Sequence, residues 1–262
     1  MSILKFHEKK GVEKISMVTC YDYTSARLFS QTSIDCLLVG DSVAMTMHGF
    51  KDTTFATLEM MCFHTQAVAR GAGDKFILGD MPFLSYRKSL SKSVNAAQQL
   101  IQSGAHAIKL EGAAGNEQLI RHLTESGIPV MGHVGLTPQL IHTLGGYKIQ
   151  GRTDESIKRL KNDILLLQEA GCFAIVLECV TAPLARELTA MLSIPTIGIG
   201  SGPDTDGQVL VMQDLLGLNN DFKPRFVKNF MNGAEQFKNS IENYIHAIQL
   251  GEFPNDEHSF MY

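Results

Sequence analysis

The sequence lacks long apolar runs, blocks of basic residues and paired cysteines, and each absence argues against a class of protein. No stretch approaches the roughly 18 apolar residues of a membrane-spanning helix. The 262 residues carry a net charge of −4 without a basic patch, so nucleic-acid binding is not expected. The five cysteines form no C-x-x-C pair and mostly lie in apolar segments, as buried thiols in a reducing cytoplasm do. The start, MSILKFHEKK, lacks the apolar core of a signal peptide, so we expect a cytoplasmic protein.

The sequence does have a regular alternation of short apolar runs and longer amphipathic stretches. The apolar runs are continuous, as in parallel strands that are covered on both faces. Strands are predicted near residues 15–21, 36–40, 75–79, 106–110, 129–133, 173–178 and 195–200, with a weaker eighth strand at 225–229. Helices are predicted near residues 23–32, 57–71, 89–104, 116–127, 155–171, 182–192 and 233–250.

This rhythm of about eight strand–helix units is typical of a (β/α)8 TIM barrel, an α/β fold. A doubly wound open sheet alternates in the same way, but it normally carries a glycine-rich turn after its first strand. The turn here reads TCYDYTSA, which favours the barrel. No Pro/Ser/Gly-rich linker divides the chain, so we predict one catalytic barrel domain over residues 1–262, with a polar tail from about residue 251.

Acidic residues follow several of the predicted strands. LLVGDS, FILGDMP, AIKLEG and AIVLECV place Asp41, Asp80, Glu111 and Glu178 at strand ends, and GHVGLTPQ adds His133. Active sites of TIM barrels form at the C-terminal ends of the strands, so these side chains are expected to converge at one mouth. Desolvated carboxylates need a partner there, and for an acid cluster this is most commonly a metal ion.

Each of these residues also has a purely structural interpretation when it is taken alone. Asp41 suits a helix cap, Asp80 a turn and Glu111 a solvated loop. His133 suits a satisfied core histidine, and Cys179 is a poor candidate nucleophile because no partner histidine is identifiable by spacing. The repetition of acids at the ends of four strands favours the functional interpretation.

The candidate ligands are carboxylates without a cysteine or histidine cluster. Such a set suits Mg²⁺ first and Mn²⁺ second, and it disfavours zinc. Mg²⁺ held by a few carboxylates keeps positions open, which the keto and carboxylate oxygens of a 2-oxo acid would fill. Lys109 lies on the same strand face as Glu111, and it either meets the substrate carboxylate or pairs with one of the acids.

Two glycine-bearing segments have a less specific pattern. GIGSG, residues 198–202, is either a phosphate-binding turn, as barrels often have after strand seven, or a tight turn that allows close backbone approach. LGGYKIQGR, residues 144–152, has the composition of a lid or binding loop.

The order of these motifs resembles that of the ketopantoate hydroxymethyltransferase family. The matching segments, from about Val18 to about Phe230, are LLVGDS, GDMPF, IKLEG, GHVGLTPQ, GGYKIQGR, VLECV and IPTIGIGSG with TDGQVLV. The resemblance implies a TIM barrel of the phosphoenolpyruvate/pyruvate type, which agrees with the number of strand–helix units. The chain differs from the usual family pattern in GFKDTTFATLEM, residues 49–60, and at Ser201, and neither difference touches a proposed ligand or base.

The resemblance also implies roles for individual residues. The implied Mg²⁺ ligands are Asp41, Asp80 and Glu111, the last by way of a water. The implied substrate-binding residues are Asp41, Ser42, Asp80, Lys109 and His133. The implied proton acceptor is Glu178.

The activity that the resemblance implies is transfer of a hydroxymethyl group from 5,10-methylenetetrahydrofolate to 3-methyl-2-oxobutanoate. The product would be 2-dehydropantoate (ketopantoate), for pantothenate and coenzyme A biosynthesis, formed through an enolate that Mg²⁺ stabilises. The folate co-substrate and an expected homodecamer rest on the resemblance alone. No nucleic-acid or membrane partner is expected.

Two other functions are compatible with the same features. One is that of another Mg²⁺-dependent lyase or mutase of this barrel superfamily, although the K-K-C-G-H loop of lyases that resemble isocitrate lyase is not found here. The other is a catalytically silent barrel that acts as a binding protein. Such a protein would be expected to have lost one or more of the acids, and all of them are present.

Overall fold

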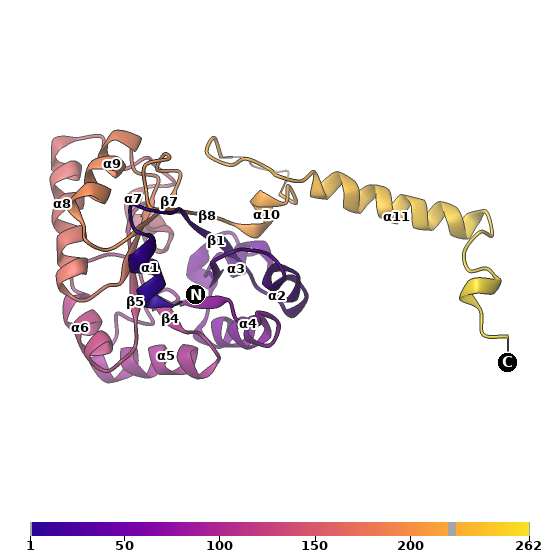
Figure 1. The fold of residues 1–262 in the computed structure, drawn as a ribbon, viewed down its shortest axis with the longest axis horizontal. Helices are drawn as coiled ribbons and strands as arrows, with labels where there is room; N and C mark the ends of the chain where they lie inside the picture. Colours follow the sequence, from indigo (N-terminus) through magenta and orange to yellow (C-terminus); the bar gives the residue numbers. More distant parts are fainter. Residues whose placement is uncertain (1, 220–223, 262) are drawn as a thin grey trace. The chain divides into compact units, whose positions relative to one another are not determined.

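The computed structural model describes residues 2–219 and 224–261, and the chain divides into two compact units, Met1–Val211 and Met212–Tyr262. The first unit contains a closed barrel of parallel strands in sequential order (Figure 1). Its strands are β1 (Ile15–Thr19), β2 (Cys36–Val39), β3 (Phe76–Asp80), β4 (Ala107–Lys109), β5 (Val130–Gly135), β6 (Ala174–Glu178), β7 (Thr196–Ile199) and β8 (Gly207–Leu210). β8 pairs with both β7 and β1, which closes the barrel and confirms the predicted TIM-barrel fold.

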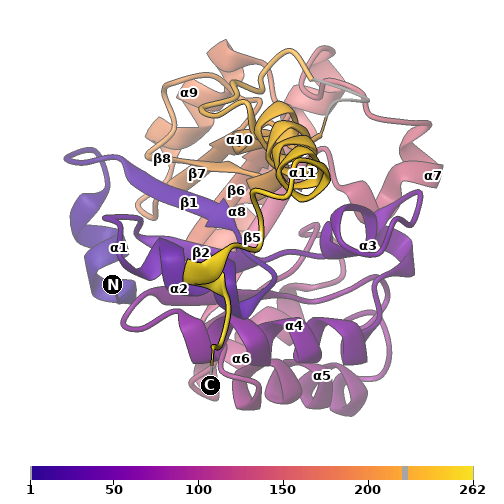
Figure 2. The same cartoon turned by 90° about the vertical axis from the view of Figure 1, so that its right-hand side faces the viewer.

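Helices and short 3₁₀ turns connect the strands. They are α1 (Ile3–Lys9), α2 (Tyr23–Ser30), α3 (Val43–Thr46), η1 (Thr53–Phe55), α4 (Leu58–Gly71), α5 (Leu90–Gln102), α6 (Glu117–Glu125), η2 (Pro138–Leu140), α7 (Ile141–Leu144), α8 (Asp154–Glu169) and α9 (Ala182–Met191). Helices α4, α5 and α6 lie side by side on the outside of the barrel (Figure 2). Local capping starts several of these helices: Asp22 accepts from the Ser25 amide before α2, and Thr57 accepts from the Met60 amide before α4.

Seven predicted strands are confirmed, and the predicted eighth is wrong. Residues 225–229 lie outside any strand, and the last barrel strand is β8. It lacks a continuous apolar run because Gly207 starts it and an exposed Gln208 follows. The glycine is required there, since a Cβ at Gly207 would lie 2.5 Å from the backbone oxygen of Ile15 on β1.

The inside of the barrel is apolar, and its N-terminal end is closed by α1. Phe6 of this helix is fully buried and makes edge contacts with Phe76 and Phe173, both at 5.3 Å between ring centroids. Buried side chains from the strands, such as Met17 and Met131, continue this packing. The buried charged side chains Asp41, Asp80, Lys109 and Glu111 lie at the opposite end, where the strands terminate.

The second unit contains α10 (Met212–Leu215), α11 (Gly233–Gln249) and η3 (Asp256–His258). Helix α11 corresponds to the helix predicted at 233–250, and the polar tail expected from about residue 251 lies in this unit. Across the residues that the structure describes, no helix combines the length and apolar character needed to span a membrane.

A buried carboxylate stabilises the turn before β8. Asp206 is 6% exposed; its Oδ2 accepts from the Thr196 amide at 2.8 Å and pairs with Lys10 Nζ at 2.9 Å. Its Oδ1 accepts from the Gly11 amide at 3.1 Å. One side chain therefore links the segment after α1 to β7 and β8, at the seam where the barrel closes.

We predict that Asp206→Ala lowers the free energy of unfolding by about 3 kcal/mol, because it leaves buried amides and a lysine without their acceptor. Chemical denaturation followed by circular dichroism measures this change. The control is Asp204→Ala, whose carboxylate forms a surface pair with Arg186 and should contribute less than about 1 kcal/mol. Equal stability of the two variants would contradict the role given to Asp206.

Candidate active site

The structure brings the sequence-predicted acids together at the C-terminal end of the barrel. Asp41 follows β2, Asp80 ends β3, Glu111 follows β4 and Glu178 ends β6. Of the residues predicted at this site, five are at most 5% exposed: Asp41, Asp80, Lys109, Glu111 and His133. Their proximity follows from the common direction of the strands in a closed parallel barrel.

An ion pair between neighbouring strands lies at the centre of this cluster. The register of β3 and β4 places Asp80 beside Lys109, and Lys109 Nζ lies 2.9 Å from Asp80 Oδ1. Burial alone would lower the pKa of Lys109, but Asp80, Glu111 and Asp41 together raise it above its ordinary value. Lys109 therefore stays charged although it is only 4% exposed.

Burial and neighbouring acids destabilise the ionised forms of both aspartates. The Asp41 amide donates to Asp80 Oδ2 at 3.2 Å, which places the two residues in direct contact. Burial raises the pKa of Asp41 well above its usual range, and the charges of Asp80 and Glu111 raise it further. Burial and Glu111 also raise the pKa of Asp80, with Lys109 opposing. A cation at this position would relieve the repulsion.

Gln139 joins the cluster, and it is a residue that the sequence did not single out. Its Nε2 donates to Asp41 Oδ2 at 2.8 Å and to the Met81 carbonyl at 3.0 Å. Its backbone amide donates to Glu111 Oε2 at 3.1 Å, and its Oε1 accepts from the Tyr86 hydroxyl at 2.7 Å. The motif GHVGLTPQ ends on this residue, but nothing in a neutral amide indicates contacts to two acids.

His133 on β5 lies between two carboxylates, not in the apolar core. Its Nδ1 is 3.5 Å from Glu111 Oε1 and 3.4 Å from Lys109 Nζ, and its Nε2 is 3.3 Å from Glu178 Oε2. Burial and Lys109 would lower the pKa of His133, but Glu111 and Glu178 outweigh them and raise it to about 9. The ring is therefore protonated at neutral pH and lies against Glu178.

Glu178 differs from the other acids because its side chain is 18% exposed, so a substrate at the mouth has access to it. The next residue, Cys179, has a φ of 50°, a left-handed conformation that few non-glycine residues adopt. Its amide donates to the Ile199 carbonyl at 2.8 Å, which fixes the turn after β6. Burial raises the pKa of the Cys179 thiol to about 12, so the thiol is neutral and a poor nucleophile.

Ser42, predicted to bind substrate, precedes α3 and is partly buried. Its Oγ lies 2.8 Å from the hydroxyl oxygen of Tyr21, a fully buried side chain. Tyr21 thereby orients the Ser42 side chain next to Asp41.

The GIGSG segment forms a close structural turn. Ser201 is fully buried; its Oγ donates to the Leu177 carbonyl at 2.7 Å and accepts from the Val180 amide at 3.1 Å. A Cβ at Gly202 would lie 2.6 Å from the Cβ of Ala182 at the start of α9. These contacts favour the tight-turn interpretation over a phosphate site.

The segment predicted as a lid, residues 144–152, is attached to the site at one end. The Gln150 amide donates to the Cys179 carbonyl at 2.8 Å, directly beside Glu178. Tyr147 is 54% exposed, and its hydroxyl lies 3.9 Å from Met45 Sδ after β2. The lid function stays a prediction.

The donor chemistry of the cluster fits a hard cation. Glu111 Oε1 is buried and has no hydrogen-bond partner among the described residues. Within residues 2–219 and 224–261, no three His, Cys, Asp or Glu side chains surround a common point closely enough to enclose a metal unaided. Mg²⁺ is usually bound through one or two carboxylates and several waters, so two direct ligands with a third reached through water suit this arrangement.

Comparison with known proteins gives close relatives over the whole chain. The profile of the family described as ketopantoate hydroxymethyltransferase matches residues 1–256. A 3-methyl-2-oxobutanoate hydroxymethyltransferase from Francisella tularensis subsp. tularensis is 55% identical over 261 residues, which cover 100% of this chain and 99% of that protein. The protein of the same name from Coxiella burnetii is 56% identical, covering 95% of this chain and 94% of its own.

Solved structures share the fold at low sequence identity. Phosphonopyruvate hydrolase has a TM-score of 0.63 at 10% identity, covering 99% of this chain and 91% of its own. A 2,3-dimethylmalate lyase, described as a PEP mutase/isocitrate lyase superfamily member, has a TM-score of 0.56 at 18% identity and covers 79% of each chain. These likenesses concern the fold, whereas the full-length sequence matches concern the family. The chain belongs to the ketopantoate hydroxymethyltransferase family, a family of transferases.

Proposed function

We propose that the protein transfers a hydroxymethyl group from 5,10-methylenetetrahydrofolate to 3-methyl-2-oxobutanoate, giving 2-dehydropantoate for pantothenate and coenzyme A biosynthesis. The observation that carries the proposal is the buried group of acids around Lys109 and His133, with the accessible Glu178 at its edge. Membership of the family supports the choice of substrates. The five cysteines are all free thiols, which supports a reducing cytoplasm as the location.

Asp41 and Asp80 are the proposed direct ligands of Mg²⁺, with Glu111 reaching it through a water. The raised pKa values of both aspartates support this choice, as does the buried Glu111 Oε1, which accepts no hydrogen bond from the described residues. When bound, Mg²⁺ would supply electron withdrawal from the substrate ketone, which acidifies the neighbouring C3–H.

The remaining steps use side chains of the protein. Lys109 offers a buried positive charge to the substrate carboxylate, and Ser42 a hydroxyl. Glu178 removes the C3 proton, and the protonated His133, 3.3 Å away, orients its carboxylate. The electron pair of the broken C–H bond forms an enolate, whose C3 attacks the methylene carbon of the folate as one of the two C–N bonds of that carbon breaks and the released nitrogen takes up a proton. Water then supplies the hydroxyl group, and tetrahydrofolate leaves as the second C–N bond breaks and its nitrogen takes up a proton of that water.

We predict that Glu178→Gln lowers exchange of the substrate C3 proton at least about a hundredfold, because the amide cannot accept the proton. Proton NMR of 3-methyl-2-oxobutanoate in D₂O, with Mg²⁺ and without folate, measures the exchange. Affinity for the 2-oxo acid should stay within about threefold of wild type, since the variant keeps the size of the side chain. The control is Cys179→Ser, which should exchange the proton normally.

The same experiment discriminates between the candidate functions. If Glu178→Gln lost substrate affinity as much as exchange, Glu178 would have a structural or metal-holding role. If the wild type failed to exchange the proton both without and with added tetrahydrofolate, the protein would be a silent barrel. Exchange without subsequent transfer from the folate would favour another superfamily reaction.

We predict that Asp80→Asn weakens Mg²⁺ and 2-oxo acid binding together, each by about tenfold or more, because one neutral oxygen replaces an ionic ligand. Isothermal titration calorimetry measures both affinities, and removal of the metal with EDTA should stop C3–H exchange in the wild type. Asp74→Asn is the control, because Asp74 is exposed and precedes the other end of β3. Unchanged affinities in Asp80→Asn would remove Asp80 from the metal site.

We also propose that the chain forms a homo-oligomer, with the decamer expected from the family resemblance. Helix α11 supports this proposal because it exposes an apolar stripe at helical spacing. The stripe contains Phe237, Ile241, Tyr244, Ile245 and Ile248, which are between 39% and 64% exposed. Exposed apolar stripes of this kind are typical of contacts between chains.

Replacement of two of these residues, Phe237→Glu with Ile241→Glu, is predicted to reduce the molar mass that light scattering measures after size-exclusion chromatography. Two buried carboxylates in an apolar contact are strongly unfavourable. Lys238→Glu is the control, since it adds a carboxylate on the same helix outside the stripe. A wild-type monomer, or an unchanged mass in the double variant, would argue against association through α11.

A further inference from the structure

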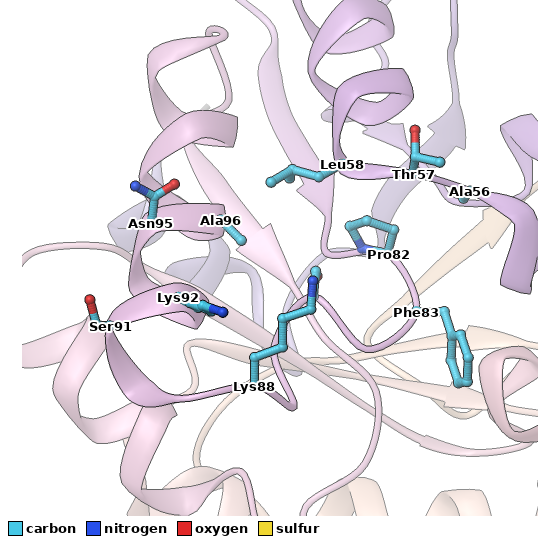
Figure 3. Close-up of a pocket in the computed structure, with 11 residues that line it drawn as sticks. Ala56, Thr57, Leu58, Pro82, Phe83, Lys88, Ser91, Lys92, Asn95 and Ala96 are labelled. Carbon is cyan, nitrogen blue, oxygen red and sulfur yellow. The ribbon is translucent and has the colours of Figure 1, made fainter.

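A cavity of about 500 Å³ lies beside the acid cluster, and no step proposed above uses it. It is bounded by the N-terminal ends of α4 and α5 and by the loop that follows β3 (Figure 3). Thr57 and Leu58 line it from α4, Pro82 and Ser85 from the loop, and Lys92 from α5.

The cavity is electropositive. Lys88, just before α5, and Lys92, in its first turn, both line it, and their side chains extend toward the hollow (Figure 3). Among the residues that the structure describes, neither lysine forms an ion pair with an acid. The N-termini of α4 and α5 add the partial positive charge of their free amides.

A buried hydroxyl also lines this cavity. Ser85 is 7% exposed, and its Oγ has no hydrogen-bond partner within residues 2–219 and 224–261. The turn that holds it is fixed, because the Ser85 amide donates to the Pro82 carbonyl at 2.9 Å. An unsatisfied buried hydroxyl costs free energy, so Ser85 is a donor that a bound acceptor would satisfy.

We propose that this cavity binds the glutamate carboxylates of the reduced folate donor, an inference that rests on the proposed function. A glutamate tail carries two carboxylates, which match two ammonium groups, a hydroxyl donor and two helix N-termini. Pro82 and Phe83 add apolar surface for the ring next to the tail. A cavity for an uncharged ligand would need neither lysine.

The position of the cavity relative to the acids supports this ligand. Its wall at Pro82 continues directly into Met81, whose carbonyl accepts from Gln139 Nε2 at 3.0 Å. The same amide group donates to Asp41 in the acid cluster. The cavity wall and the acid cluster are therefore joined by one continuous segment, from Asp80 to Pro82, and by the amide of Gln139.

The test compares the wild type with Lys88→Gln/Lys92→Gln in the full-length protein. The dissociation constant of tetrahydrofolate triglutamate, measured by calorimetry, should rise about tenfold at low salt, and less at high salt where charges are screened. The KM for 5,10-methylenetetrahydrofolate should rise in parallel, with kcat within about twofold of wild type. Ser85→Ala should also raise the dissociation constant, whereas Lys158→Gln, on the exposed surface of α8, should leave it unchanged.

The rate of C3-proton exchange of the 2-oxo acid without folate shows whether the acid cluster is folded. This rate should be equal in the wild type and the double variant. Equal folate affinity of these two proteins would overturn the inference and leave the proposed function intact. A wild-type protein that exchanges the C3 proton but does not bind tetrahydrofolate would overturn both the inference and the proposed function. If inorganic phosphate binds the wild type but not the double variant, while both proteins bind folate with equal affinity, the cavity is a general anion site and the inference fails.

Discussion

Repulsion among buried carboxylates is the interaction on which the rest of the site depends. Asp41, Asp80 and Glu111 are almost excluded from water, and burial with neighbouring charges raises the pKa of both aspartates. Lys109 and Gln139 offset part of this cost through an ion pair and a hydrogen bond. One oxygen of Glu111 accepts no hydrogen bond from the described residues and lies 3.5 Å from His133 Nδ1, and for this reason we propose a hard cation at the cluster.

The barrel tolerates these charges because it separates them from its apolar interior. Phe6 closes the N-terminal end against Phe76 and Phe173, and the buried strand side chains fill the space behind it. The charged groups lie beyond this core, at the ends of strands whose register is fixed by backbone pairing. Stability therefore depends on the N-terminal ends of the strands and chemistry on their C-terminal ends, as is general in TIM barrels.

Much of this arrangement could be predicted, because continuous apolar runs and acids at their ends are local signals. Strand β8 was not predicted because a glycine and an exposed glutamine replace the apolar residues. Its pairing partner Ile15 lies in β1, at the start of the barrel sequence. Gln139 was not predicted as a site residue for a different reason. Its partners come from segments as distant as Asp41, and only the closed barrel brings them within hydrogen-bond distance.

The loop after β3 connects the acid cluster to the cavity between α4 and α5. Asp80 forms the ion pair with Lys109 at one end of this segment, and Ser85 lines the cavity at the other. Leu84 between them has a φ of 58°, a left-handed conformation that turns the chain sharply. A transferase must hold two substrates in a fixed mutual orientation, because their alignment contributes strongly to the rate. A short loop with one end in each site would hold the two substrates in a fixed orientation. The free-energy cost of the strained Leu84 backbone would then be explained by this positioning role.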